Sequence, residues 1–454
     1  MFRKVQQIHF VGIGGSGMSG IAEVLLNLGY RVTGSDLHYT ETIKRLEGLG
    51  GKIFVGHHPS NIGTAQVVVI SSAVSQDNVE VQAARERLIP VIPRAEMLAE
   101  LMRLKYSIAI AGAHGKTTTT SLVAAVLAGG ELDPTAVIGG KFNRFGSHAK
   151  LGQGDFLVAE ADESDGSFLK LSPTMAVVTT IDREHMDYYK GLDAIKRAFL
   201  EFLNKVPFYG LAVVCLDQEH LQALIPYLTK RYVTYGMTTQ ADLSALEVRF
   251  LGWESEFTVQ YRQRDLGRFR LPLPGLHNVY NALAAIAVGL ELEIGVEAIR
   301  SALAEFAGVE RRFQRVGEKR RITVVDDYGH HPTEIKATLA AARAGWNRRL
   351  VVVFQPHRYS RTRDLMEEFS TAFYQADSLI LTEIYPAGEQ PIQGISGERL
   401  YEQVKQHGHK EAIFLPTVEA IVEAMPSLVR PGDMVITLGA GDVWKVGRML
   451  LERL

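Results

Sequence analysis

The first hundred residues of the chain alternate between short apolar runs and amphipathic stretches. The apolar runs predict buried parallel strands, because a strand covered on both faces carries hydrophobic residues without interruption. The amphipathic stretches have apolar residues at helical spacing, with Asn78 as an expected N-cap and Pro93 at a helix start. Strands are expected at 8–13, 30–33 and 67–70, and helices at 18–28 and 94–103. This alternation predicts an α/β domain built on a parallel sheet.

The same pattern starts twice more along the chain. In the central part, strands are expected at 107–111, 156–159, 175–179 and 211–215, and helices at 117–128 and 278–290. Residues 242–273 alternate with few helix formers, which predicts short antiparallel strands. Beyond a basic stretch at 311–321, strands are expected at 322–325, 350–354, 378–381 and 434–437. We therefore expect three α/β domains: a Rossmann-like domain at 1–104, a central domain with a small antiparallel sheet at 105–311, and a second Rossmann-like domain at 312–454.

The composition is that of an ordinary globular protein. With 46% apolar and 22% charged residues among 454, a disordered chain, a collagen and a coiled coil are excluded. The formal net charge of −2 gives no overall basic surface, and the basic stretch at 311–321 has no interleaved aromatic residues, so no nucleic-acid partner is expected. The single cysteine, Cys215, lies in an apolar run and is expected to be a buried thiol.

The apolar runs are short. The longest, at 282–290, is about half of what a membrane span needs. The start of the chain carries Arg3 and Lys4 and then Gln6 and Gln7, and it lacks the apolar core of a signal peptide. We expect a cytoplasmic protein with no membrane partner.

A glycine-rich turn follows the first predicted strand. Gly12, Gly14 and Gly17 satisfy the G-x-G-x-x-G pattern, and Asp36 ends the second strand. Glycines let the backbone approach a pyrophosphate, the helix N-terminus supplies N–H donors, and the acid accepts from a ribose hydroxyl. The turn predicts a bound diphosphate. The motif alone does not separate nicotinamide, flavin and nucleotide-sugar ligands.

A second phosphate-binding loop lies at 112–118, again between a strand and a helix. It reads G-x-x-G-K-T and is shorter than the full P-loop pattern, whose first glycine position is held by Ile110. Glycine and helix amides wrap phosphates, Lys116 neutralises their charge, and the Thr117 hydroxyl can bind Mg²⁺. The loop predicts a P-loop ATPase-type central domain that binds ATP or GTP.

Two acidic runs follow this loop, each after a predicted strand. Their members are Glu160, Asp162, Glu163 and Asp165 in the first run and Asp182, Glu184, His185 and Asp187 in the second. If the first strand extends, Glu160 and Asp162 point to the same face. Carboxylates with one imidazole favour Mg²⁺ or Mn²⁺ over zinc. Neither run contains a serine-nucleophile motif, so the expected chemistry is activation of a substrate oxygen by phosphoryl transfer.

Taken together, these motifs resemble the Mur ligase family over essentially the whole chain. The resemblance is carried by segments 12–18 (GIGGSGM), 112–119 (GAHGKTTT), 160–164 (EADES), 182–187 (DREHMD), 275–281 (GLHNVYN), 311–313 (RRF), 326–332 (DDYGHHP) and 355–361 (QPHRYSR). It implies an ATP-dependent ligase with three domains that close over the substrates. The motifs are most similar to members that join UDP-N-acetylmuramate to L-alanine through an acyl phosphate in peptidoglycan precursor synthesis.

The resemblance also implies roles for individual residues. The UDP part of the substrate would be bound by Gly12, Gly14, Gly15, Ser16, Gly17, Asp36 and Ser71. ATP would be bound by Gly112, Ala113, His114, Gly115, Lys116, Thr117, Thr118, Asn278, Asn281 and Arg312, and the metal, Mg²⁺ or Mn²⁺, by Thr117, Glu160 and His185. Lys116, Arg312 and Asp327 would be catalytic, and His330, His357, Arg358 and Arg361 would face the muramoyl and amino-acid end.

Two departures from the family pattern are visible, and they leave the lysine and the metal ligands in place. Ala113 stands where the loop usually has threonine, and Thr180 where the strand before the histidine motif usually ends in asparagine.

Three alternatives stay open. A ligase that adds a preformed peptide to UDP-N-acetylmuramate shares most motifs, although its glycine turn usually contains a cysteine that Gly14 replaces here. An NAD-dependent oxidoreductase would account for the first glycine turn, but it would give no function to Lys116, Glu160 and His185. A non-catalytic nucleotide switch would bind ATP and leave the first turn empty. For oligomeric state, a monomer or a homodimer is expected.

Overall fold

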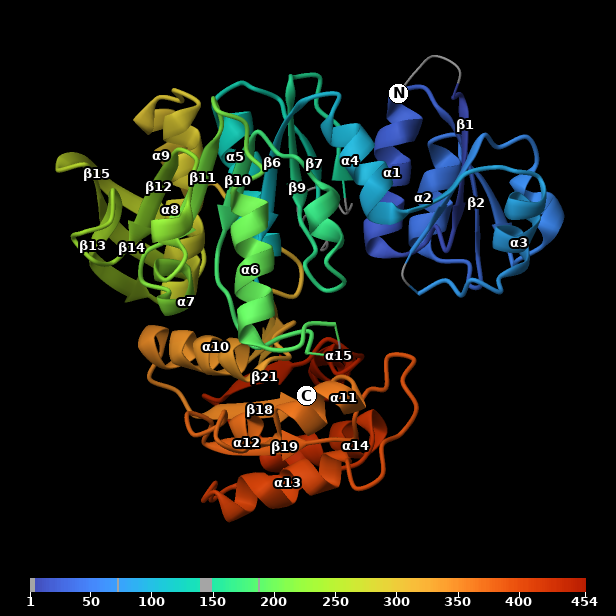
Figure 1. The fold of residues 1–454 in the computed structure, drawn as a ribbon. Coiled ribbons are helices and arrows are strands. Elements are labelled where there is room, and N and C mark those ends of the chain that lie inside the picture. The colour runs from blue at the N-terminus through green and yellow to red at the C-terminus, as the bar shows by residue number, and fades with distance from the viewer. Residues whose placement is uncertain (1–4, 72, 139–148, 187) are drawn as a thin grey trace. The chain divides into compact units, whose positions relative to one another are not determined.

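A computed structural model describes residues 5–71, 73–138, 149–186 and 188–454. The chain forms two compact units (Figure 1). The first comprises Met1–Glu247, Phe257–Arg270 and Tyr280–Ala307, and the second comprises Val248–Glu256, Leu271–Val279 and Gly308–Leu454.

The N-terminal part of the first unit is a five-stranded parallel sheet in the order β3-β2-β1-β4-β5, blue in Figure 1. Its strands are β1 (Gln7–Val11), β2 (Arg31–Asp36), β3 (Lys52–Val55), β4 (Val67–Ile70) and β5 (Val91–Pro93), and its helices are α1 (Ser16–Asn27), α2 (Glu41–Gly48), α3 (Val79–Glu86) and α4 (Arg94–Met102), with the 3₁₀ helix η1 (Pro59–Ile62). Asn78 caps α3 by accepting from the Glu80 amide, as the sequence predicts. The strand order reverses beside β1, so the turn after β1 lies at the position where open α/β sheets bind ligands.

The central sheet has ten strands in the order β15-β14-β13-β12-β11-β10-β6-β9-β7-β8. They are β6 (Tyr106–Ala111), β7 (Thr135–Val137), β8 (Ala149–Lys150), β9 (Phe156–Glu160), β10 (Met175–Val178), β11 (Leu211–Cys215), β12 (Tyr232–Gly236), β13 (Leu243–Leu251), β14 (Glu254–Tyr261) and β15 (Arg264–Leu271). The expected antiparallel strands are the consecutive hairpins β13–β15. They extend the main sheet, because β13 pairs in parallel with β12.

Helices follow several strands of this part. They are α5 (Lys116–Gly129), α6 (Leu192–Leu203), α7 (Glu219–Gln222), α8 (Leu276–Glu291) and α9 (Val296–Ala304), with the 3₁₀ helices η2 (Ser167–Lys170) and η3 (Ile225–Tyr227). Two of them, α8 and α9, come after its last strand, β15. Cys215 ends β11 and is buried, and this burial raises the pKa of its thiol to about 12. The expectation of a buried structural thiol is confirmed.

The C-terminal sheet has six strands in the order β16-β17-β21-β18-β19-β20. They are β16 (Gln314–Lys319), β17 (Ile322–Asp327), β18 (Leu350–Phe354), β19 (Ser378–Leu381), β20 (Ala412–Phe414) and β21 (Met434–Leu438). The helices are α10 (Pro332–Gly345), α11 (Tyr359–Asp364), α12 (Met366–Ser370), α13 (Gly397–Gln406), α14 (Val418–Leu428) and α15 (Trp444–Arg453). β16 lies in the basic stretch, where no strand was expected, and pairs antiparallel with β17.

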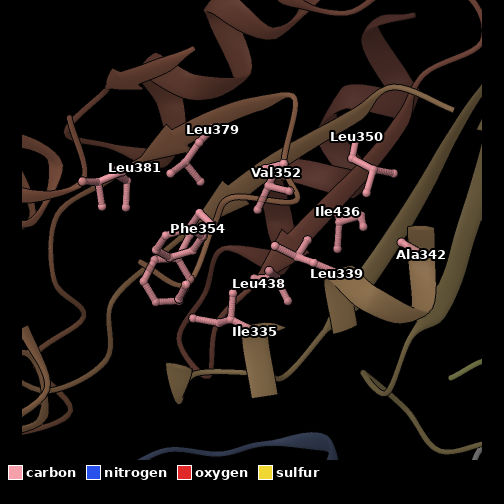
Figure 2. Close-up of a cluster of buried hydrophobic side chains, with 14 of the residues drawn as sticks. Ile335, Leu339, Ala342, Leu350, Val352, Phe354, Leu379, Leu381, Ile436 and Leu438 are labelled. Atoms are coloured by element: carbon pink, nitrogen blue, oxygen red, sulfur yellow. The ribbon is translucent and has the colours of Figure 1, made fainter. Parts of the chain in front are cut away.

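Successive side chains of the central strands point to opposite faces of this sheet, and a hydrophobic cluster buries each face. Figure 2 shows Val352 and Phe354 of β18 in one cluster with Ile335 and Leu339 of α10. The intervening residue Val353 belongs to a second cluster, which includes residues of α14 and α15. The buried parallel sheet predicted from continuous apolar runs is confirmed here. Among the described residues, no helix is both long enough and apolar enough to cross a membrane.

Candidate functional site

The predicted phosphate loop joins β6 to α5, and two of its residues must be glycine. Gly112 and Gly115 have φ values of +131° and +82°. A Cβ on Gly112 would collide with the hydroxyl of Thr179, and one on Gly115 would lie 2.5 Å from Asn281 Oδ1. The loop therefore closes tightly on the surrounding residues. The amides at the start of α5 face this loop, as anion binding requires.

Residues of the next strand connection hold the loop in place. The amide of Ala113 donates to the Thr180 carbonyl at 3.0 Å, and the amide of His114 donates to the Thr180 hydroxyl at 2.9 Å. The His114 ring lies 2.9 Å from Asp182 Oδ2. Thr180, one of the departures from the family pattern, thus satisfies two loop amides.

Lys116 points from the first residue of α5 into this loop. Its Nζ donates to the Gly112 carbonyl at 2.6 Å and to Glu163 Oε1 at 2.7 Å. Burial by itself lowers the pKa of Lys116, but the carboxylates of Glu163 and Asp162 outweigh it and raise that pKa above its usual value. The lysine is therefore a fixed positive charge at the place where a phosphate would enter.

Glu163 is the most deeply buried acid of this site, with 3% of its side chain exposed. Burial raises the pKa of Glu163 well above its usual value, although Lys116 opposes this. Among the described residues, its Oε2 atom has no hydrogen-bond partner. The side chain therefore has the capacity to bind a further positively charged ligand.

Three side chains form a group suited to a metal ion. Ligand atoms of Glu163, Glu184 and His185 all lie within 4.8 Å of one another. Two carboxylates and one imidazole match the preferences of Mg²⁺ or Mn²⁺, and the unsatisfied Oε2 of Glu163 supplies an open ligand position. The residues present therefore fit the expected metal.

The metal ligands predicted from the family are placed as follows. His185 belongs to the group just described, but Glu160 does not. Glu160 is the last residue of β9 and pairs in register with Ile110, directly before the phosphate loop. Thr117 and Thr118 are buried in the first turn of α5. Asp187 lies outside the described residues.

The two predicted asparagines lie at the start of α8. Asn281 Oδ1 accepts from the Thr119 hydroxyl at 3.1 Å, which brings it to the phosphate-loop helix. Asn278 is buried, and its Nδ2 donates to the Pro274 carbonyl at 2.8 Å.

The glycine turn of the N-terminal sheet is built around Asp36. The amide of Gly14 donates to Asp36 Oδ2 at 2.8 Å, and a Cβ on Gly14 would lie 2.9 Å from the same oxygen. Gly12 has φ +76°, and Ser71 Oγ lies 3.8 Å from the Cβ that it lacks. Gly15 is the N-cap of α1, so Ser16 and Gly17 begin the helix whose N-terminus faces the turn. The structure thus places Asp36 as a support of the turn.

One further residue at this turn, Arg94, was missed by the sequence prediction. Arg94 begins α4, and its Nη2 donates to Asp162 Oδ2 at 2.9 Å. Its Nη1 lies 2.5 Å from the position of a Cβ on Gly17. Burial opposes the ionisation of Asp162, but the charges of Lys116 and Arg94 hold the pKa of that carboxyl at about 2. The available signal was an arginine at the carboxyl end of a parallel strand.

In the second unit, the predicted catalytic acid is part of the local framework. Asp327 accepts from the amides of Phe313 and Gly329 at 2.7 and 2.8 Å and from the hydroxyl of Thr338 at 3.2 Å. Arg312 lies over the ring of Tyr328, 5.1 Å from its centroid. The neighbouring Arg311 is fixed by Asp326 at 2.9 Å.

The four residues expected at the amino-acid end lie close to one another. The rings of His330 and His357 are 5.9 Å apart, and Arg361 Nη1 lies 3.3 Å from His357 Nδ1. His357 also stacks on Tyr385, which sequence reasoning missed. Arg358 is the N-cap of α11, with φ +71°. Burial and the neighbouring positive charges of this group lower the pKa of His357 to about 3, so its ring is neutral.

Known proteins match the chain along its whole length. Three family models match in succession: "Mur ligase family, catalytic domain" at residues 7–106, "Mur ligase middle domain" at 110–289 and "Mur ligase, glutamate ligase domain" at 311–441. A UDP-N-acetylmuramate–L-alanine ligase from Geotalea uraniireducens is 62% identical, and the match covers 100% of this chain and 99% of that one. The ligase of the same name from Syntrophotalea carbinolica is 60% identical over the same shares.

A solved structure agrees with these matches. The UDP-N-acetylmuramate–alanine ligase of Thermotoga maritima superposes with a TM-score of 0.83 at 31% identity, covering 98% of both chains. The chain belongs to the Mur ligase family.

Proposed function

We propose that this chain is the ATP-dependent ligase that forms the amide bond between UDP-N-acetylmuramate and L-alanine in peptidoglycan precursor synthesis. The observation that carries this proposal is the 62% identity, over the whole chain, to a protein of that activity. The geometry supports it independently, because a diphosphate-binding turn and a lysine-bearing phosphate loop occur in one unit.

The nucleotide sugar binds at the first turn. Its diphosphate lies at the N-terminus of α1, against Gly12, Gly14, Gly15, Ser16 and Gly17, with Ser71 nearby. Asp36 shapes this turn through the Gly14 amide, so its contribution to uridine binding is indirect. A diphosphate at a helix N-terminus meets both backbone donors and the positive end of the helix dipole.

ATP binds at the second loop. Gly112, Ala113, His114, Gly115, Thr117 and Thr118 surround its phosphates, and Lys116 carries the positive charge. Glu163, Glu184 and His185 would hold Mg²⁺. The family pattern also names the Thr117 hydroxyl and Glu160 for this role, and Glu160 lies outside the group of three. When bound, the ion supplies charge neutralisation to the transferred phosphoryl group. Asn281, bonded to Thr119, positions the loop, while Asn278 and Arg312 are assigned to the nucleotide by the family pattern.

The reaction follows from these sites. The muramoyl carboxylate attacks the γ-phosphate of ATP, giving an acyl phosphate and ADP. The amine of L-alanine then attacks the acyl carbon, and phosphate leaves as the amide forms. Lys116 stabilises charge on the transferred phosphoryl group.

The amino-acid end is assigned to His330, His357, Arg358 and Arg361. Arg361 Nη1 donates to His357 Nδ1, so the neutral His357 ring carries its proton on Nε2 and can donate from it to a substrate oxygen, and the positive charge of Arg361 attracts the alanine carboxylate. Asp327 acts by holding residues 311–313 through the Phe313 amide, and it supports Arg312 in this way. Because ATP and nucleotide sugars are intracellular metabolites, we expect the reaction to take place in the cytoplasm.

The test is phosphate release from ATP with Mg²⁺ and UDP-N-acetylmuramate, adding one amino acid at a time. UDP-N-acetylglucosamine, which lacks the lactyl carboxylate, is the matched acceptor control. Release that requires both UDP-N-acetylmuramate and L-alanine supports the proposal. Release only with a peptide identifies a peptide-adding ligase, and release with no amino acid added, or in no mixture, overturns the assignment.

A further inference from the structure

A cavity lined by arginines lies in the second unit, at the amino ends of parallel strands of the C-terminal sheet. Its wall is formed by α10 with the loop before β18, the residues just before β19 and β20, and the end of α14 with the loop after it. His357 and Arg358, which are assigned to the amino acid, follow the carboxyl end of β18. The five residues of β18 separate the two places by about 16 Å, at about 3.3 Å per residue. This arginine cavity is therefore distinct from the group around His357.

The arginine cavity has the size of a small-molecule site. Its volume is about 710 Å³, and pockets for small molecules usually measure about 300 to 1,000 Å³. Asn347 and Ser427 add polar groups to its wall, and Leu428 and Val429 add apolar surface. A single inorganic ion would fill only a small part of this space. The dimensions suit a ligand about as large as a nucleotide.

The lining carries more positive than negative charge. Its charged residues are four arginines and two acids, namely Arg343, Arg348, Arg349, Arg430, Asp377 and Glu411. Four positive and two negative charges leave an excess of two, although the whole chain has a formal net charge of −2. The local excess therefore does not follow from the composition, and it favours an anionic ligand.

Two of the arginines are held by acids. Arg343 Nη2 donates to Asp377 Oδ2 at 2.6 Å, and Arg349 Nη1 donates to Asp433 Oδ2 at 2.9 Å. Asp433 is buried, with 2% of its side chain exposed, and it reduces the excess of positive charge to one. Asp377 also accepts from the Leu350 amide at 2.7 Å, at the start of β18. A structural role therefore accounts for Arg343 and Arg349, which fix the wall of the cavity.

The other two arginines are not accounted for in this way. Arg348 Nη1 donates to the Thr323 hydroxyl at 2.6 Å, and a hydroxyl does not neutralise the guanidinium. Arg430 has 71% of its side chain exposed, and its ion pair with Asp433 is long, at 3.8 Å. Because a guanidinium has five N–H donors, both side chains keep donors for a ligand. Glu411, the remaining acid of the lining, is exposed, so solvent screens its charge.

We propose that the arginine cavity binds a phosphorylated small molecule of nucleotide size, with Arg348 and Arg430 as its phosphate-binding residues. The planar donors of arginine match the oxygens of a phosphate group. A nucleotide and free inorganic phosphate share this chemistry, and the volume of the cavity favours the nucleotide. The inference goes beyond the proposed function, because none of the residues that line the cavity belongs to the ligase sites.

The experiment is modification of the arginines of the full chain by phenylglyoxal, with each adduct located by mass spectrometry of its peptide. The probes are ADP, UDP, inorganic phosphate and adenosine. ADP or UDP is expected to slow the modification of Arg348 and Arg430 about tenfold at a concentration of about ten times its Kd, because only unoccupied sites react. Arg399, a half-exposed arginine of α13 that pairs with Glu402, is the control and is expected to react at an unchanged rate.

The probes separate the two sources of phosphate. Protection by a nucleotide at lower concentration than inorganic phosphate supports the proposal. Equal protection by all three phosphate compounds overturns the nucleotide assignment and leaves a site for inorganic phosphate. Protection by adenosine equal to that by ADP, or no protection by any probe, overturns the inference.

A second measurement separates the cavity from the proposed ATP site. Equilibrium dialysis with radiolabelled ADP counts the nucleotides bound per chain. R348M/R430M, which keeps both stems and removes both charges, is expected to bind one ADP fewer than the unmodified protein, and R399M the same number. In K116A, protection of Arg348 and Arg430 is expected to persist. Equal numbers of bound ADP in R348M/R430M and the unmodified protein overturn the inference, as does loss of protection in K116A.

A single variant keeps the test decisive if R348M/R430M does not fold. R430M alters a mostly exposed side chain, and it is expected to raise the Kd of ADP at the cavity about tenfold, as loss of a charge-assisted hydrogen bond does. The readout is the ADP concentration that protects Arg348 from phenylglyoxal. An unchanged concentration in R430M overturns the role of Arg430. A protein without ligase activity can still pass this test, so failure of the proposed function and failure of this inference are distinguishable.

Discussion

Thr119 and Asn281, 162 positions apart in the chain, are joined by a hydrogen bond of 3.1 Å between the Thr119 hydroxyl and Asn281 Oδ1. Both residues are buried. The same amide oxygen lies against Gly115, the N-cap of α5. The Asn281 side chain of α8 therefore contacts the first turn of the phosphate-loop helix and also occupies the space next to Gly115.

This relationship predicts that Gly115→Ala weakens nucleotide binding. The new Cβ would displace the Asn281 side chain and strain a backbone at φ +82°. We expect the Kd of ATP to rise more than tenfold, measured by titration with the nucleotide. Gly29→Ala is the matched control, because its φ of +85° carries a similar backbone cost while nothing lies within 4 Å of the added Cβ. Equal effects of the two substitutions on ATP binding would contradict the prediction.

Lys116→Ala tests the central positive charge. Removal of one preorganised cation that stabilises transition-state charge typically lowers the rate by about 10² to 10³. We expect a fall of at least this size in kcat for phosphate release with UDP-N-acetylmuramate and L-alanine. Lys170→Ala, at an exposed lysine of the same unit, is expected to retain the normal rate. Near-normal turnover of Lys116→Ala would remove this residue from the mechanism.

Thr180→Val tests the departure from the family pattern. The substitution keeps the shape of the side chain and removes the hydroxyl that accepts from the His114 amide at 2.9 Å. We expect the KM for ATP to rise several-fold, because an unsatisfied amide loosens the loop at a cost of about 1 to 3 kcal/mol. Thr180→Asn, which restores an acceptor, is expected to recover most of the affinity. Thr64→Val removes an exposed hydroxyl bond to Gln7 and serves as the control.

Much of the fold and both ligand turns could be predicted from the sequence. The strands at 67–70, 211–215, 350–354 and 378–381 have the predicted bounds, because buried parallel strands are continuous apolar runs. The two glycine turns were also recognisable, since their chemistry lies in consecutive residues. β16 was not, because its edge position leaves the strand mostly polar.

The acidic run shows why part of the site could not be predicted. Glu160 and Asp162 would point to the same face only if the strand extended beyond Glu160, but β9 ends at Glu160. The chain then turns, with the Gly166 amide bonded to the Glu163 carbonyl at 3.0 Å, and Glu163 becomes the buried partner of Lys116. Arg94 was missed for a related reason: its contact with Asp162 spans 68 positions and depends on how two sheets pack.

A buried acid on helix α3 of the N-terminal part makes the stability of the protein depend on pH. Glu80 is fully buried, and burial alone would raise the pKa of its carboxyl. Hydrogen bonds with His9, Ser35 and Asn61 outweigh that effect and lower the pKa from 4.5 to about 2. The Asn61 amide donates to Oε1 at 2.6 Å, and the Ser35 hydroxyl donates to Oε2 at 2.5 Å. The ionised form is therefore the one that the fold stabilises.

Because the folded-state pKa of Glu80 is lowered, its contribution to stability is present above pH 4.5 and is lost as the pH falls from 4.5 toward 2. A shift of this size corresponds to a few kcal/mol, about 1.4 per pKa unit. Glu80→Gln is expected to lower the free energy of unfolding at pH 7 and to flatten its decline below pH 4.5, both measured by urea unfolding. Glu86→Gln, at the exposed end of the same helix, is expected to leave both unchanged. An equally steep acid decline in Glu80→Gln would assign the pH dependence to other carboxylates.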